Sequence, residues 1–128
     1  MNDQLEVNKK IVLEYTELAL NQRKVEEAVA KYLGPNYRQH NPGAKDGGES
    51  FIAFVKWFAQ QYPSFHGEVK RIMAEGNLVI THTHLILEPG DRGQAVIDIF
   101  RLENGKIVEH WDVVQAIPEK SANNNTMF

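Results

Sequence analysis

The chain has 128 residues, of which 42% are apolar and 24% are charged, with a formal net charge of −3. This length predicts one domain with its own core, and the slight acidity argues against a nucleic-acid partner, which usually needs a basic face. The sequence has no cysteine, no apolar signal segment in residues 1–10 and no apolar run near the ~20 residues of a membrane span, which excludes disulfides and thiolate chemistry and predicts a cytoplasmic protein without a membrane partner.

The first half of the chain predicts helices. Apolar residues recur at every third or fourth position over residues 5–20, 25–33 and about 49–61, which is the spacing of a buried helix face. Because a helix that packs on a sheet must bury such a face, the aromatic stripe of the third helix favours a core role over a cofactor site. That stripe consists of Phe51, Phe54, Trp57 and Phe58.

The segment 36–48 contains Asn-Pro and Gly-Gly and predicts a loop, with a short strand at 37–40. In an extended chain alternate side chains point the same way, so one set of its polar residues would reach a cavity between helices and sheet. The candidate substrate-binding residues here are Tyr37, Gln39, His40 and Asn41. The alternative is a structural loop held by Asn-Pro turn chemistry.

After Pro63 the apolar spacing changes to every second residue and predicts four strands, at 66–74, 78–87, 94–102 and 106–115. The connections between them are short and contain glycine, as hairpin loops do, so neighbouring strands should be antiparallel. We therefore expect an α+β fold, with N-terminal helices packed on one face of a curved antiparallel sheet. The polar tail from about residue 118 is expected to be frayed.

Two histidines alternate along the second predicted strand, in the order Thr81-His82-Thr83-His84. Both imidazoles would share one face, as a His-x-His metal site requires, with a third ligand from Asp98, His66 or His110. The other interpretation makes His82 and His84 polar residues that line a cavity or an exposed sheet face.

A carboxylate stands among apolar residues on the third predicted strand, where Asp98 shares a face with Val96 and Phe100. A buried carboxylate is costly unless it is paired or protonated, so Asp98 is either a structural acceptor bonded to Arg or His, or a working acid. His110 and Asp112 share a face of the last strand, roughly ~7 Å apart at the backbone. Together with Asp98 these residues predict a patch for general acid/base chemistry, with Phe100 as a substrate contact.

Two segments, residues 37–42 (YRQHNP) and 98–114 (DIFRLENGKIVEHWDVV), resemble the SnoaL-like polyketide cyclase family of the NTF2-like superfamily. The likeness extends over about residues 8–117. It implies a cone-shaped α+β fold with a pocket roofed by helices, and ring closure by aldol condensation without metal or cofactor. The family's acid/base aspartate falls on Asp112, and a second pocket position falls on Asp98. His40, His82, His84 and His110 would make this pocket more polar than the family's apolar pockets.

On this resemblance we expect a cofactor-independent lyase or isomerase that acts on a small carbonyl compound. Asp112 would remove the proton beside the carbonyl, and His110, His40 or Gln39 would donate to the enolate oxygen. The alternatives are a non-catalytic small-molecule-binding dimer and a metal-dependent enzyme built on His82 and His84.

Apolar residues also occupy the strand positions opposite the predicted pocket, and a sheet must cover such a face. We therefore expect a homodimer that packs sheet against sheet through Ile97, Ile99, Trp111 and Val113.

Overall fold

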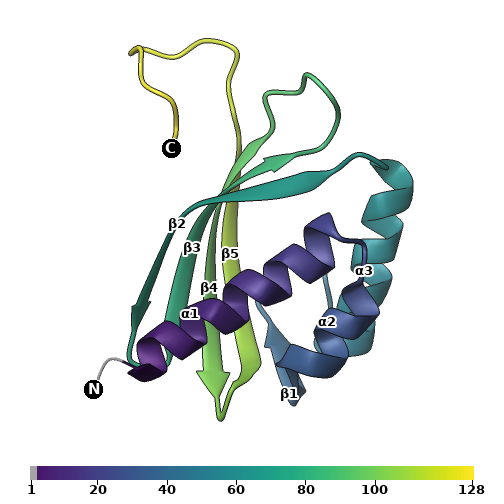
Figure 1. Ribbon diagram of the computed structural model, residues 1–128. Helices are drawn as coiled ribbons and strands as arrows, with labels where there is room; N and C mark the ends of the chain where they lie inside the picture. The colour runs from purple at the N-terminus through teal and green to yellow at the C-terminus, as the bar shows by residue number, and fades with distance from the viewer. Residues whose placement is uncertain (1–2) are drawn as a thin grey trace.

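The computed structural model describes residues 3–128 and consists of helices packed on one face of a curved sheet (Figure 1). The helical elements are α1 (Asp3–Thr16), a π-helical turn η1 (Glu17–Asn21), α2 (Val25–Tyr32) and α3 (Gly48–Gln61). The strands are β1 (Leu33–Gln39), β2 (His66–Glu75), β3 (Leu78–Ile86), β4 (Gln94–Glu103) and β5 (Lys106–Ala116). The α+β class is therefore confirmed.

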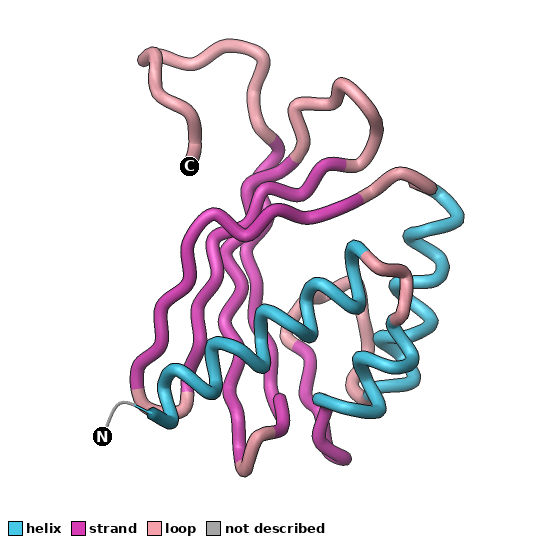
Figure 2. The backbone as a smooth tube through the Cα atoms, in the orientation of Figure 1, coloured by secondary structure: helices cyan, strands magenta, loops and turns pink. Residues whose placement is uncertain are grey.

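The sheet is mixed rather than wholly antiparallel, with strand order β1-β5-β4-β3-β2. The four later strands form the expected antiparallel meander, whereas β1 pairs parallel with β5 at the edge (Figure 2). A parallel neighbour needs a long crossover, which α3 and the meander supply. The sequence predicted only a short strand at 37–40, because Gly34 and Pro35 read as a helix stop. An edge strand tolerates a proline, since one side of it has no ladder to complete.

The first predicted helix continues to Asn21, but its last turn widens into the π-helical η1. The core lies between α1, α2, α3 and the inner face of the sheet, and its least exposed large side chains include Val12, Phe65, Val79 and Ile107. Phe51, Phe54 and Phe58 pack against this core as predicted, whereas Trp57 is 53% exposed.

The β4–β5 hairpin turns at Asn104 and Gly105, whose φ angles are both positive at 51° and 79°. Such a two-residue turn matches the twist of the strands it joins. The ladder then shifts between Arg101 and Leu102, a β-bulge that gives β5 one extra residue.

The tail after β5 contains no further helix or strand, but its last side chain is packed. The Phe128 ring lies 5.1 Å from the His82 ring and 4.6 Å from the His84 ring, measured between centroids. Within residues 3–128 no helix is long and apolar enough to cross a membrane.

Candidate active site

A cavity of about 230 Å³ lies between the inner face of the sheet and the helices. Most of its wall is apolar and comes from α1, η1, α3 and the strands; it includes Leu20, Phe51, Phe54, Phe58, Phe65, Leu85, Val96 and Phe100. Polar side chains gather at β1, β4 and β5, namely Tyr37, Gln39, Asn41, Asp98, His110 and Asp112. A largely apolar cleft with a few convergent polar groups is the usual form of a small-molecule site.

The pairing of β4 with β5 brings the two aspartates together. Asp98 lies directly opposite Asp112, and Phe100 lies opposite His110. One ligand atom from each of Asp98, His110 and Asp112 lies within 4.8 Å of the others. The expectation that these three side chains face one cavity is therefore confirmed.

The bulge in this hairpin determines which residue meets Asp98. Glu103 pairs with Lys106 at the turn, so an uninterrupted ladder would set Asp98 opposite Trp111. The extra residue moves the register by one and turns Asp112 inward in place of Trp111. Bulges often re-aim side chains beside active sites in this way.

The parallel strand β1 and the segment that follows it supply a second group of polar side chains. Gln39 is paired with His110 in the sheet, and its Oε1 lies 2.8 Å from His110 Nδ1. Asn41 Nδ2 donates to both carboxylate oxygens of Asp112 at 2.9 Å. Of the two alternating sets of side chains in this segment, the one that reaches the cavity is Tyr37, Gln39 and Asn41.

Backbone groups fix the direction of both amides. The Asn41 backbone N–H donates to Gln39 Oε1 at 2.9 Å, and the Gly43 backbone N–H donates to Asn41 Oδ1 at 2.7 Å. Because a backbone N–H only donates, each of these side-chain atoms must be the amide oxygen. Gln39 therefore offers an acceptor to His110, and Asn41 offers its donors to Asp112.

This orientation constrains the protons of the Asp98–His110 pair. His110 Nδ1 must carry a proton in order to donate to Gln39 Oε1. His110 Nε2 lies 2.8 Å from Asp98 Oδ1, and two lone pairs at that distance would repel, so a proton lies between them. The pair therefore holds this proton either as imidazolium and carboxylate or as neutral imidazole and carboxylic acid.

Two tyrosines face the same cavity. Tyr15 on α1 is 3% exposed, and its hydroxyl has no hydrogen-bond partner among the described residues. The Tyr37 hydroxyl accepts from Gln39 Nε2 at 3.0 Å. Burial raises the pKa of both phenols, with a further increase from nearby Asp98, so both stay protonated. In the sequence, Tyr15 belongs to the helix predicted at residues 5–20. Apolar spacing does not distinguish a tyrosine that only packs in the core from one that donates a hydrogen bond to a ligand.

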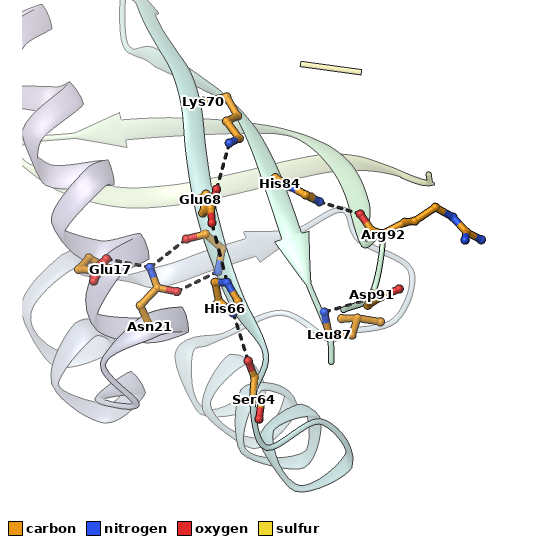
Figure 3. Close-up of polar contacts among 11 residues, drawn as sticks. Glu17, Asn21, Ser64, His66, Glu68, Lys70, His84, Leu87, Asp91 and Arg92 are labelled. Carbon is orange, nitrogen blue, oxygen red and sulfur yellow. Dashed lines mark hydrogen bonds and ion pairs between the residues drawn. The ribbon is translucent and has the colours of Figure 1, made fainter. Parts of the chain in front are cut away.

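The structure places His82 and His84 outside the cavity, which corrects the expectation that they line it. Strand alternation turns Thr83 of β3 inward and both histidines to the outer face. Arg71 donates to His82 Nδ1. His84 Nε2 donates to the backbone carbonyl of Arg92 at 2.7 Å (Figure 3).

His40 also lies on the outer face, which corrects its expected place in the pocket. Its Nε2 donates to Glu109 Oε2 at 2.7 Å, and its ring stacks on Trp111 with centroids 4.8 Å apart. Arg101 donates to the other Glu109 oxygen at 2.8 Å. The hydrogen bonds from His40 and then from Arg101 hold the pKa of the Glu109 carboxyl below its usual range.

The alternative metal site around His82 and His84 does not assemble in residues 3–128. Asp98 and His110, two of its possible third ligands, lie on the inner face, and His66 lies beside Glu68 with 3.9 Å between His66 Nε2 and a carboxylate oxygen. The group with metal-like spacing is Asp98, His110 and Asp112. Both ring nitrogens of His110 are already bonded there, so a cation would have to displace the proton shared with Asp98.

A family model for the SnoaL-like domain matches residues 12–110. Many solved structures have the same fold, including the following three. A proposed isomerase of the SnoaL-like family from Agrobacterium tumefaciens is 19% identical, covers 87% of this chain and 99% of its own, and has a TM-score of 0.74. A proposed ketosteroid isomerase from Kribbella flavida is 21% identical, covers 92% of this chain and 84% of its own, and has a TM-score of 0.72. A proposed polyketide cyclase from Acidithiobacillus ferrooxidans is 18% identical, covers 84% of this chain and 87% of its own, and also has a TM-score of 0.72. No curated protein matches.

Proposed function

The chain belongs to the SnoaL-like domain family, and on that premise we propose that it is an acid/base enzyme that removes a proton beside a carbonyl group. The observation that carries the proposal is the placement of a base and several proton donors in one largely apolar cavity. The base is Asp112, and the donors are the Asp98–His110 pair and the Tyr15 hydroxyl.

Asp112 suits the role of base because Asn41 donates to both of its oxygens, which is the contact expected of a carboxylate. In the proposed step, an Asp112 oxygen takes the proton from the carbon next to the substrate carbonyl. The electron pair of that C–H bond moves into the new C=C bond, and the C=O electrons move onto oxygen. The substrate is then an enolate, and Asp112 is a carboxylic acid.

The negative charge of the enolate oxygen needs donors that are in place before the reaction. The proton shared by Asp98 and His110 lies in the same cavity as Asp112 and would fill this role. The Tyr15 side chain is part of the cavity wall, and its buried hydroxyl, which has no partner among the described residues, would be a second donor. Because most of the cavity wall is apolar, these hydrogen bonds act in a medium of low dielectric constant, where they are stronger than in water.

Return of the proton from Asp112 completes the cycle in one of two ways. If a different carbon of the enolate takes the proton, the reaction is an isomerisation. If the enolate carbon attacks a second carbonyl of the same molecule, a C–C bond forms and the new alkoxide oxygen takes the proton, which is the ring-closing aldol addition of an aldol condensation. Proton abstraction is common to both reactions, so it is the step to test.

The test is exchange of substrate protons with deuterium, followed by NMR in D₂O for β-tetralone and a set of 1,3-diketones. The wild-type protein should accelerate exchange beside the carbonyl. Asp112→Asn should slow it by roughly 10²–10⁴, the usual contribution of one general base. Asp91→Asn is the matched control, because Asp91 lies exposed in the β3–β4 connection.

Equal exchange by Asp112→Asn and wild type would contradict the proposal. Binding of the ketones without any accelerated exchange would favour the alternative function, a non-catalytic small-molecule-binding protein.

A further inference from the structure

The ionisable groups of the cavity carry a net negative charge, because the Asp98–His110 pair is neutral overall wherever its proton lies and Asp112 is a carboxylate. The cavity wall contains the carboxyl groups of Asp98 and Asp112 and the imidazole of His110, and among residues 3–128 no lysine or arginine lines it. The proton shared by Asp98 and His110 neutralises part of this charge, while Asn41 contributes only a neutral amide to Asp112. A negatively charged ligand would therefore enter a confined, largely apolar space beside the Asp112 carboxylate, where the His110 imidazole is already paired with Asp98.

The size of the cavity is also limited. Its volume of about 230 Å³ lies below the roughly 300–1,000 Å³ of pockets that hold drug-sized ligands. Phe54 on α3 forms part of this wall and also lines a neighbouring shallow groove together with Trp57 and Lys45. The Phe54 ring is stacked on Phe58 at 5.9 Å between centroids, so its position is supported from within the cavity wall. Phe54 therefore stands between the cavity and the groove.

We infer that the cavity accepts compact, uncharged carbonyl compounds of about two fused rings and excludes carboxylates and larger ring systems, with Phe54 setting the size limit. This inference rests on the proposed function for the carbonyl group, whereas its charge and size limits come from the cavity itself. The apolar wall buries the ring system, and the polar end at Asp98, His110 and Asp112 meets the carbonyl oxygen and the adjacent carbon.

Binding measured by isothermal titration calorimetry near neutral pH tests the charge limit. The probes are β-tetralone and the tetralin-carboxylic acid that places a carboxylate at the ketone position. The acid should bind about 100-fold more weakly, because juxtaposed like charges cost several kcal/mol in a confined site. Equal or tighter binding of the acid would overturn the inference, and so would failure of β-tetralone to bind.

A substitution that adds a cation sharpens this test. Val114 lines the cavity and is 44% exposed, whereas Val113 points to the outer face and is 72% exposed. Val114→Lys should strengthen binding of the acid at least tenfold relative to binding of β-tetralone by the same variant. Val113→Lys adds the same charge on the opposite face and should change neither. If both variants improve binding of the acid equally, the discrimination against carboxylates does not arise in the cavity, and the inference is overturned.

The size limit is tested with androstenedione, a four-ring ketone. It should bind the wild-type protein at least tenfold more weakly than β-tetralone does, and Phe54→Ala should remove most of that difference. Trp57→Ala is the matched control, because Trp57 lines only the neighbouring groove. Phe54→Leu serves as a second variant if Phe54→Ala lowers the melting temperature. Tight androstenedione binding to wild type, or equal gains in Phe54→Ala and Trp57→Ala, would overturn the role of Phe54.

Calorimetry and deuterium exchange separate this inference from the proposed function. Selective binding of the neutral bicyclic ketone without exchange would uphold the ligand class and contradict the enzyme. Exchange that is equally fast on androstenedione would uphold the enzyme and contradict the size limit, whereas the charge limit is judged by calorimetry alone because the acid has no ketone.

Discussion

The two faces of the β4–β5 hairpin carry similar residues and place them in different surroundings. On the inner face, His110 bonds Asp98 and Gln39 within a largely apolar cavity. On the outer face, His40 bonds Glu109, which also bonds Arg101. The outer carboxylate has a cation beside it, whereas the inner carboxylates have only a shared proton and neutral donors. Residue type alone therefore does not identify a reactive group; its surroundings on one face of the sheet do.

The largest expected effect after loss of Asp112 belongs to Asp98. Asp98→Asn keeps the side-chain shape, and its amide can donate to a neutral His110, but the shared proton is lost. Deuterium exchange should fall by roughly 10²–10⁴, with little change in melting temperature. A large drop in melting temperature with normal exchange would instead make Asp98 a structural acceptor, and the inner face would then resemble the outer one.

Tyr15→Phe removes the buried hydroxyl that has no partner in the described residues. Exchange should slow by about 10², the low end of the effect of losing one donor to a developing oxyanion. The melting temperature should stay the same or rise, because a buried unsatisfied hydroxyl is unfavourable. Tyr32→Phe, on α2 and outside the cavity wall, is the matched control. Unchanged exchange in Tyr15→Phe would remove this hydroxyl from the mechanism.

The oligomeric state of the protein tests the role of the outer face of the sheet. Ile97 and Val113 are 39% and 72% exposed there, next to Trp111, and we propose that this surface packs against a second copy of the chain. Val113→Glu would bring like charges together across a two-fold interface and should reduce the mass in light scattering from twice 14.6 kDa to that of one chain. A wild-type protein that is monomeric at micromolar concentration would contradict the proposal.

Glu109→Gln should affect stability rather than exchange. Because His40 and Arg101 lower the pKa of Glu109 in the folded state, the ionised carboxylate stabilises the fold above its usual pKa of 4.5. This contribution, about 1 kcal/mol for partly screened charge-assisted bonds, is lost as the pH falls through the lowered folded-state pKa. The difference in melting temperature between wild type and Glu109→Gln should thus be largest near neutral pH and shrink in acid. A difference independent of pH would mean that the ionised form contributes nothing.

The smallest effect is expected for His82→Ala and His84→Ala. Both side chains lie on the outer face against Phe128, so deuterium exchange should change less than twofold. The melting temperature reports the loss of their contacts. A fall in exchange like that of Asp112→Asn would show that the two faces are not separate in function.

Local patterns were enough to predict the helices, the meander and which residues share a face within each strand. The same patterns failed where a contact depends on residues distant in the chain. The position of β1 beside β5 was not predicted, because Gly34 and Pro35 mark a helix end and carry no information about a parallel partner. His82 and His84 were expected inside the pocket because alternation shows that two residues share a face, but not which face is buried.

The meeting of Asp98 with His110 and Asp112 was predicted from alternation within each strand. That prediction holds only because of the bulge near Val108, since a regular ladder from the Asn104-Gly105 turn would have turned Asp112 outward. The bulge has no signature in the sequence that separates it from an ordinary strand. The roles of Gln39 and Asn41 depend on backbone donors that only the folded segment provides.

The parallel pairing of β1 with β5 also sets when the site comes into existence. The bonds from Gln39 to His110 and from Asn41 to Asp112 each join residues 71 positions apart in the chain. During synthesis β1 cannot pair until nearly the whole chain has been made, because its partner β5 is the last strand. Contacts of such high sequence separation form late in folding, and an edge strand is among the first elements to open in the native state. Incomplete chains therefore lack the complete set of polar contacts, and fluctuations of β1 would break the contacts to His110 and Asp112 while the remaining sheet stays folded.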